Sequence, residues 1–416
     1  MDNSNHWVVF LSNKADKNIF IQQLLNKRAI GQFAFFNTID GVLFSAIAIK
    51  ELIEEEERHE YVEVATTTNR HLRYLSGGEQ KKALLAYLLL QKPGFIIADN
   101  PFDNLDIASK GSLLVMLQQI AADVPIIQII NRTKDWLPFI RNAVSINDEN
   151  VFVHEHDIPG FIAKQQVNDI SVEGRIIPPS DQHYGIVTSP LIQFNNVTVQ
   201  YEERVIVKDI CWQINAGEFW QLIGPNGSGK TTLLSLLTGD NTKGYGQDII
   251  LFGKRKGSGE TVWSIKEKIG YFTSSMTDLF SRHTNVEQMI ISGYFDSIGL
   301  YVKPSGRQIK LAKQWLGLIG MVPQKSIPFY TLSLGQQRMV LIARAMVKHP
   351  PLLILDEPTA GLDDKNTAII TALINKIASE TNTAILYVSH RAEEGLNPTF
   401  SFTLLPGKNG STGNIL

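Results

Sequence analysis

Two stretches of the chain align with each other without a gap. One, LSGGEQKKALLAYLLLQKPGFIIADNPFDNLD, begins at Leu75, and the other, LSLGQQRMVLIARAMVKHPPLLILDEPTAGLD, begins at Leu332. Self-similarity over this length predicts a tandem duplication. The chain has 416 residues, which is long for a single core but sufficient for two domains of ordinary size.

Each copy contains a helix-length segment with a period of about 3.6 that leads into an apolar run. These runs are GFIIAD in the first copy and LLILD in the second, and further apolar runs, PIIQII and AILYVS, follow downstream. Short apolar runs that alternate with helices predict an α/β fold with a mainly parallel sheet in each copy.

The pattern weakens between about residues 155 and 190, where prolines at positions 159, 178, 179 and 190 lie among polar residues and glycines. This composition is typical of a linker. We therefore predict a first domain over 1–154, a linker over 155–190 and a second domain over 191–416. The tail PGKNGSTGN is expected to be a turn or a frayed end.

Composition narrows the classes of protein that the chain can belong to. A net charge of −2 gives no reason to expect nucleic acid as a partner through bulk charge. The single cysteine, Cys211, excludes an intrachain disulfide and is expected to be a small buried residue. The start MDNSNHWVVF lacks the regions of a signal peptide, and the apolar stretches are too short to span a bilayer. We expect a cytoplasmic chain that reaches a membrane only through a partner, as a peripheral protein on the inner face of the plasma membrane.

The second copy contains the segment GPNGSGKT, which follows the apolar run FWQLI and leads into the helix-forming segment TTLLSLLTG. It matches the phosphate-loop pattern G-x4-G-K-[ST] in the required context of strand and helix. Backbone N–H groups of such a loop close around phosphates at the helix N-terminus. Lys230 is predicted to bridge the β- and γ-phosphate oxygens, and the Thr231 hydroxyl is predicted to bind Mg²⁺. The predicted nucleotide-binding residues of the loop are Gly224, Pro225, Asn226, Gly227, Ser228, Gly229, Lys230, Thr231 and Thr232.

Two strand ends and one extended segment supply the other candidate residues. Asp356 ends the run LLILD, where it can hold Mg²⁺ through water, and Glu357 is placed to polarise the attacking water. His390 ends AILYVSH and is a candidate for contacting the γ-phosphate, although a strand-end histidine alone is more often structural. Tyr201 precedes the loop and is a candidate for stacking on adenine, the alternative being ordinary packing.

At these residues the chain resembles the nucleotide-binding domains of ABC-type ATPases. GPNGSGKT corresponds to Walker A, LLILDE to Walker B, AGLD to the D-loop, His390 to the switch histidine and LSGGEQ to the signature. The resemblance covers both halves and implies tandem P-loop NTPase domains, each a mainly parallel sheet with a helical subdomain, that bind and hydrolyse ATP with Mg²⁺. The segments LLSLLTGDNTKGY, FGKRKGSGETVWSIKEKIGYF and ISGYFDSIGLY are similar to the tandem ABC proteins called ModF, ATP-binding proteins associated with molybdenum transport and with photorepair.

The chain departs from the family pattern mostly in its first half, which we predict to be truncated and degenerate. Lys17 lies where the Walker lysine would be, but the loop from Leu11 to Asn18 has no glycine, and Asp16 adds charge that repels phosphate. Asn100 stands at the position of Glu357, and Asn131 at that of His390. The segment between the loop and the signature is also shorter, which predicts a reduced helical subdomain. In the second half Ser274 occupies the Q-loop position, and the signature reads LSLGQQ, with Leu334 in place of glycine.

The first half nevertheless keeps an intact signature. ABC domains pair head to tail, so the resemblance implies that the sound Walker A of half two meets Ser76, Gly77, Gly78 and Glu79 of half one. The altered loop of half one would meet the altered signature of half two. We therefore expect one competent composite ATP site and one degenerate site.

Three functions are compatible with this sequence. The first is an ATPase subunit or regulator of a membrane importer for molybdate or a related oxyanion, with ATP and a transmembrane permease as partners and no nucleic acid. The second is a soluble clamp that acts on ribosomes or nucleic acid, as tandem ABC-F factors do, although their linker is long and charged. The third is an ATP sensor with little turnover, against which the retention of Glu357 and His390 speaks. If the two halves do not close on each other, a homodimer is the alternative.

Overall fold

The computed structural model describes residues 5–11, 16–59, 71–103, 105–146, 152–155, 160, 172, 174–182, 184, 189–280 and 284–416. The chain divides into two compact units. Unit 1 consists of Met1–Val167 together with the short segment Gly361–Asp364, and unit 2 consists of Asn168–Ala360 and Lys365–Leu416.

Unit 1 contains a six-stranded sheet. Its strands are β1 (Trp7–Leu11), β2 (Gly41–Phe44), β3 (Phe95–Asp99), β4 (Ile126–Ile130), β5 (Asn142–Ile146) and β6 (Phe152–Glu155). Their order is β2-β3-β4-β1-β5-β6, and every pair is parallel except β5 with β6. The apolar runs GFIIAD and PIIQII thus form neighbouring central strands, which confirms the predicted parallel sheet.

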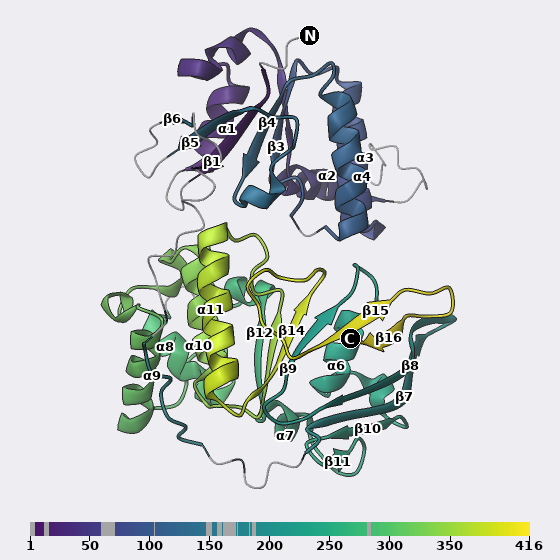
Figure 1. Cartoon of the computed structure of the whole chain (residues 1–416), viewed down its shortest axis with the longest axis vertical. Coiled ribbons are helices and arrows are strands. Elements are labelled where there is room, and N and C mark those ends of the chain that lie inside the picture. Colours follow the sequence, from purple (N-terminus) through teal and green to yellow (C-terminus); the bar gives the residue numbers. More distant parts are fainter. Residues whose placement is uncertain are drawn as a thin grey trace. The chain divides into compact units, whose positions relative to one another are not determined.

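Helices cover both faces of this sheet (Figure 1). They are α1 (Lys17–Leu25), α2 (Ala46–His59), α3 (Gly77–Leu90) and α4 (Ile107–Ile120), with the short 3₁₀ turns η2 (Gly31–Thr38), η3 (Leu72–Tyr74) and η4 (Thr133–Asp135). Successive strand residues point to opposite faces, so alternate positions of β3 and β4 serve two cores. One core includes residues of α3 and α4, and the other includes residues of α1.

Unit 2 contains two sheets. The larger has the order β12-β13-β14-β9-β15-β16 and is parallel except for β15 with β16; the smaller is antiparallel, with the order β11-β10-β7-β8. The strands are β7 (Ile192–Tyr201), β8 (Arg204–Ile214), β9 (Phe219–Ile223), β10 (Asp248–Leu251), β11 (Lys254–Arg255), β12 (Ile269–Thr273), β13 (Leu352–Asp356), β14 (Ala384–Ser389), β15 (Phe400–Leu405) and β16 (Thr412–Ile415). The tail PGKNGSTGN was expected to be a turn or a frayed end. Its first part does form the turn between β15 and β16, but the tail does not fray, because β16 pairs with β15 from Phe402 to Leu405.

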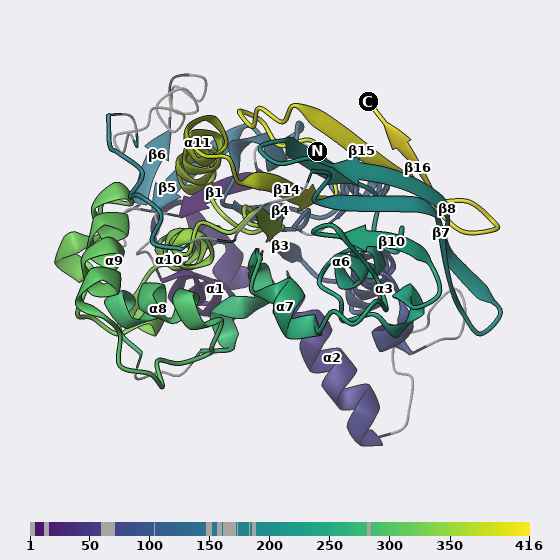
Figure 2. The same ribbon diagram turned by 90° about the horizontal axis from the view of Figure 1, so that it is seen from below.

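The helices of unit 2 form two groups. α6 (Lys230–Leu237), α7 (Val262–Lys266) and α11 (Asp364–Glu380) belong to the sheet layers, whereas α8 (Val286–Ser292) and α9 (Gly306–Leu318) pack together with α10 (Leu334–Met346). Seen from below, α8 and α9 lie on the opposite side of unit 2 from β7, β8 and β10 (Figure 2). Short 3₁₀ turns complete the unit: η5 (Thr242–Gly244), η6 (Ser274–Asp278), η7 (Gly293–Phe295), η8 (Val322–Gln324) and η9 (Phe329–Thr331).

Much of the predicted linker, namely residues 156–159, 161–171, 173, 183 and 185–188, lies outside the described residues. The described part beyond residue 168 belongs to unit 2 and is bonded to it. Arg175 donates from Nη1 to the carbonyl of Leu318 at 2.9 Å, and the Tyr184 hydroxyl donates to the carbonyl of Lys348 at 3.0 Å. Here the chain forms a strap on unit 2.

The expectation that Cys211 is buried was wrong, because its side chain is exposed on β8. Its neighbours Ile210 and Trp212 are buried in the core of unit 2. The strand bulges between β7 and β8 place Cys211 opposite Asn196, whose side-chain oxygen accepts from Sγ at 3.0 Å.

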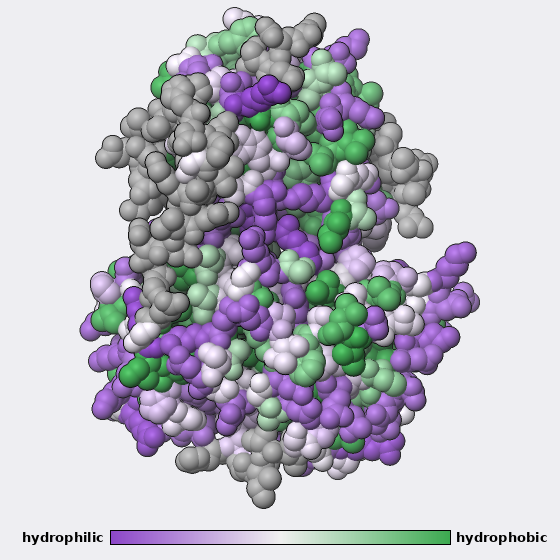
Figure 3. Space-filling model, viewed as in Figure 1, coloured by the Kyte–Doolittle hydropathy of each residue, from purple (hydrophilic) through white to green (hydrophobic). Residues whose placement is uncertain are grey.

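On the face seen in Figure 3, apolar residues lie in small separate groups among polar ones. No helix in the described part of the chain is both long enough and apolar enough to cross a membrane.

Candidate nucleotide site

The strand order of unit 2 gathers most of the predicted site residues at one edge of the sheet. β14 lies between β13 and β9, and all three run parallel. The loop after β9 holds Gly224–Gly229, β13 leads to Asp356 and Glu357, and β14 leads to His390. Carboxyl ends of parallel strands meet at one edge of a sheet, which is where α/β proteins bind ligands.

Glycine is required at several positions of the loop. Gly229 has φ +97°, and a Cβ there would lie 2.6 Å from a methyl group of Val207. Gly227 has φ +77°, and a Cβ on Gly224 would lie 2.5 Å from the Ser228 hydroxyl. A side chain at these positions would therefore meet strain or overlap, so the glycines allow the tight turn that leads into α6.

The polar atoms of the loop suit an anionic ligand. The Ser228 side chain is 1% exposed, and its hydroxyl has no hydrogen-bond partner among the described residues. Lys230 donates from Nζ to the carbonyls of Gly224 at 2.6 Å and Pro225 at 3.2 Å, so its ammonium lies over the loop. Buried groups of this kind are normally paired, and phosphate oxygens would provide partners at a helix N-terminus. The residues present therefore fit a nucleotide phosphate.

The acidic pair has two distinct environments. Burial and the neighbouring Glu357 raise the pKa of Asp356 to about 6, against the opposing effects of Lys230 and a bond from Thr273. The interaction with His390 lowers the pKa of Glu357, and the His390 Nδ1 lies 3.6 Å from Oε1 of that carboxyl. Glu357 also has φ +50°, a left-handed conformation that non-glycine residues adopt only where the surroundings hold it.

One supporting residue was missed in the sequence. Gln221 of β9 is buried at 4% exposure, and its Nε2 donates to the Ser389 hydroxyl at 3.1 Å and to the Arg391 carbonyl at 3.2 Å. These bonds hold the Ser389 side chain and the Arg391 backbone, which flank His390. A glutamine within the otherwise apolar run FWQLI was the available signal.

Tyr201 lies at the end of β7 and is 43% exposed. Its hydroxyl accepts from Asn241 Nδ2 at 2.9 Å, and the Lys243 ammonium lies 6.0 Å from the ring centroid. The hydrogen bond therefore fixes the hydroxyl end of the ring, while the ring itself remains accessible to a ligand. Stacking on adenine stays a prediction.

The signature of the first half forms the start of α3 in unit 1. Ser76 is the N-cap, in a capping box with Glu79: the backbone N of Ser76 donates to the Glu79 carboxylate at 2.8 Å. A Cβ on Gly78 would lie 2.5 Å from the Ser109 hydroxyl, so glycine fits that helix contact. A Cβ on Gly77 would meet nothing within 4 Å. The packing of unit 1 therefore gives no reason for glycine at position 77.

The first copy fills its own equivalent of the phosphate site with side chains. The Lys17 ammonium pairs with the Asp99 carboxylate at 2.9 Å, and Asn100 Nδ2 donates to the same carboxylate at 3.1 Å. Asp16 caps α1 by accepting from the backbone N of Asn18 and of Ile19. Residues 12–15 of this loop lie outside the described part. The Asp16 carboxylate thus binds the backbone N–H groups at the N-terminus of α1, which a phosphate would otherwise bind.

Comparison with known proteins agrees with this fold and with this loop. The ABC transporter family profile matches residues 207–360, and the chain belongs to the ABC transporter ATP-binding proteins, which are ATPases of the P-loop class. It is 42% identical over 340 residues to the ABC transporter ATP-binding protein ModF of Escherichia coli (strain K12), covering 80% of this chain and 69% of that protein. It is 29% identical over 330 residues to an uncharacterized ABC transporter ATP-binding protein of Schizosaccharomyces pombe, covering 77% and 66%. The chain thus spans about two thirds of the length of these relatives, and the predicted family membership is confirmed.

Solved structures share the fold. A model of ribosome-bound archaeal Pelota and ABCE1 matches with a TM-score of 0.64 at 17% identity, covering 99% of this chain and 74% of that one. A structure described as RNase-L inhibitor matches with a TM-score of 0.63 at 15% identity, covering 99% and 85%.

Proposed function

We propose that residues 224–232 of unit 2 bind the phosphates of ATP and that Glu357 polarises the attacking water. Thr231 and Asp356 would hold Mg²⁺, which neutralises phosphate charge when it is bound. His390, next to the Glu357 carboxylate, would orient the water, and Tyr201 would stack on adenine. The single observation that supports this most directly is the buried, unpartnered Ser228 hydroxyl within a glycine loop at the start of a helix. The catalysis would come from positioning and charge stabilisation.

We further propose that the competent site is composite. ATP held by the loop of half two would be closed over by Ser76, Gly77, Gly78 and Glu79 of half one, and hydrolysis would release the two halves. Gly77 supports this, because unit 1 has open space at that position and would accept a side chain there. At the equivalent position of half two, Leu334 is 40% exposed. A glycine that its own domain does not require fits a surface that a ligand approaches closely.

Gly77→Leu is therefore expected to lower the kcat for ATP hydrolysis by about 100-fold, because a side chain would block the approach of backbone amides to the γ-phosphate. Leucine is a better helix former than glycine, so the variant should be at least as stable as the wild type. Steady-state hydrolysis, the melting temperature and the ATP stoichiometry by calorimetry measure these effects.

Two control variants separate the composite site from simpler arrangements. Leu334→Gly and Lys17→Ala are expected to keep kcat within about twofold of the wild type, because both lie at the degenerate site. Hydrolysis by Gly77→Leu at the wild-type rate, or two equivalent ATP molecules per chain, would mean that the halves do not close on each other. A homodimer would then be the next arrangement to test.

The proposed role is that of an ATPase subunit or regulator of a membrane importer, with a permease as partner and with molybdate or a related oxyanion as the solute. The oxyanion is supported by the resemblance of three segments to the ModF family, which is associated with molybdenum transport. A cavity of about 310 Å³ in unit 2 supports a protein partner near the Q-loop position. Met276, Leu279 and Phe280 line it beside Lys266 and Arg344. A chain in this role would be cytoplasmic and peripheral to the membrane.

The second candidate is a clamp on ribosomes or nucleic acid, favoured only by the shared fold with the ribosome-bound archaeal structure. Sedimentation of lysate containing the ATP-loaded Glu357→Gln variant separates the two candidates. We expect the variant in the membrane fraction, with salt-washed ribosomes free of it. Its recovery with ribosomes and its absence from membranes would favour the clamp and refute the importer role.

A further inference from the structure

Residues 131–137 form the loop that follows β4 in unit 1. Side chains of β4 and α4 bind this loop and hold it in place. Gln128 of β4 is fully buried; its Nε2 donates to the carbonyl of Asp135 at 2.7 Å, and its Oε1 accepts from the backbone N of Leu137 at 2.9 Å. Lys110 of α4 bonds the Asp135 carboxylate. A fully bonded polar network of this kind fixes one backbone conformation.

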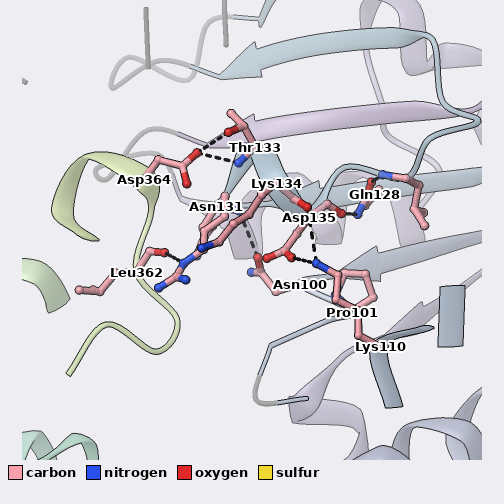
Figure 4. Close-up of polar contacts among 12 residues, drawn as sticks. Asn100, Pro101, Lys110, Gln128, Asn131, Thr133, Lys134, Asp135, Leu362 and Asp364 are labelled. Atoms are coloured by element: carbon pink, nitrogen blue, oxygen red, sulfur yellow. Dashed lines mark hydrogen bonds and ion pairs between the residues drawn. The ribbon is translucent and has the colours of Figure 1, made fainter. Parts of the chain in front are cut away.

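From this loop, successive residues bind the segment Gly361–Asp364, which is part of unit 1 (Figure 4). Arg132 is 4% exposed and donates from Nε to the carbonyl of Leu362 at 2.7 Å. Thr133 donates to one oxygen of the Asp364 carboxylate from its backbone N and from its hydroxyl, both at 2.7 Å. Two of the bonds involve a charged acceptor and one a charged donor, and such bonds are stronger than neutral ones.

The segment that these residues hold directly follows the proposed catalytic carboxylate. Gly361 is four positions after Glu357 in the chain. Glu357 has a left-handed backbone, which needs support from its surroundings. The Glu357 backbone N donates to the Val388 carbonyl at 2.9 Å, which supports the residue on one side. A fixed point four residues away adds support on the other side, because few backbone torsions separate the two positions.

We propose that Arg132 and Thr133 are positioning residues for ATP hydrolysis in the second half. They form a latch on Gly361–Asp364 and thereby hold Glu357 in its working conformation. In the first half the loop no longer presents a switch histidine, and it serves instead to steady the catalytic segment of the second half. This inference rests on the proposed role of Glu357.

Thr133→Val and Thr133→Ser form a matched pair. Valine keeps the shape and the backbone N–H but loses the hydroxyl donor, whereas serine keeps the donor. Thr133→Val is expected to lower kcat about tenfold with the KM for ATP unchanged, because a small misplacement of a catalytic group slows the chemical step more than it weakens binding. Thr133→Ser is expected to retain at least about half of the wild-type kcat. Steady-state hydrolysis by the full chain over a range of ATP concentrations measures both constants.

Several results would overturn the latch. They are a wild-type kcat in Thr133→Val, an equal loss in the serine variant, or a raised KM at constant kcat. Should Thr133→Val lower the melting temperature, Arg132→Lys decides by the same criterion, since it keeps the charge but removes the Nε donor.

Glu357→Gln separates failure of the latch from failure of the proposed role of Glu357. If that variant still turns over, the proposed role of Glu357 fails, whereas an inactive Glu357→Gln beside a normal Thr133→Val refutes only the latch.

Discussion

Glu357→Gln is expected to lower the kcat for ATP hydrolysis by about 10³-fold, because an amide cannot accept a proton from water. Glutamine has nearly the size of glutamate and can still contact His390, so the loop that holds the phosphates should be unaffected. ATP binding should therefore persist. Calorimetry on the variant is expected to give one tightly bound ATP per chain, and steady-state hydrolysis gives the loss in kcat.

The control for this variant is Glu394→Gln, the same chemical change at an exposed position of unit 2. It is expected to hydrolyse ATP at the wild-type rate. If Glu357→Gln hydrolysed ATP within tenfold of the wild type, another group would have to polarise the water. If it lost ATP binding as well, the carboxylate would be holding the nucleotide in place.

Asp356→Asn is expected to abolish Mg²⁺-dependent turnover and at the same time to stabilise the protein without nucleotide. Burial and Glu357 raise the pKa of Asp356 to about 6, so the folded state holds this proton more tightly than the unfolded state does. The stability contributed by this group is present below its ordinary pKa and is lost as the pH rises through 6. At pH 7.5 the ionised group therefore costs about 2 to 3 kcal/mol, which asparagine removes.

Urea unfolding at pH 5 and at pH 7.5 measures this effect, and the gain should be larger at pH 7.5. The equivalent residue of the first half, Asp99, is the control with the opposite sign. Asp99 pairs with Lys17 at 2.9 Å, so Asp99→Asn is expected to lower stability. If Asp356→Asn instead destabilised the protein, favourable contacts of the Asp356 carboxylate would outweigh its burial and its repulsion by Glu357.

The strands and the residues at their ends could be predicted from the sequence, because buried parallel strands are short apolar runs and their carboxyl ends lie together. The same reasoning placed Asp356, His390 and the phosphate loop along one sheet edge. Cys211 was misplaced although the sequence could have placed it: Ile210, Trp212 and Ile214 alternate with Cys211 and Gln213, and successive strand residues point to opposite faces. The pairing of β16 was missed because turn residues in PGKNGSTGN hide a short strand that is stabilised by its neighbour and not by its own composition.

The supporting residues were harder to predict. Gln128 and Gln221 each interrupt an apolar run, and that pattern could have indicated a buried polar network. What the network holds could not be inferred, because the partners of Arg132 and Thr133 are about 230 residues away along the chain. Asp16 was predicted only to repel phosphate, but it also caps α1 and so occupies the amides that a phosphate would need.

The inclusion of Gly361–Asp364 in unit 1 has a consequence for how the protein is made. Synthesis proceeds from the amino terminus, and domains generally fold in that order. Here the amino-terminal unit cannot complete its hydrogen bonds until a segment made more than 200 residues later has emerged. Closing so long a loop is slow, and the bonds from Arg132 to Leu362 and from Thr133 to Asp364 can form only after it closes. A nascent chain that stops before residue 361 would thus carry an unfinished first unit, and the maturation of unit 1 would depend on translation of unit 2 as far as this segment.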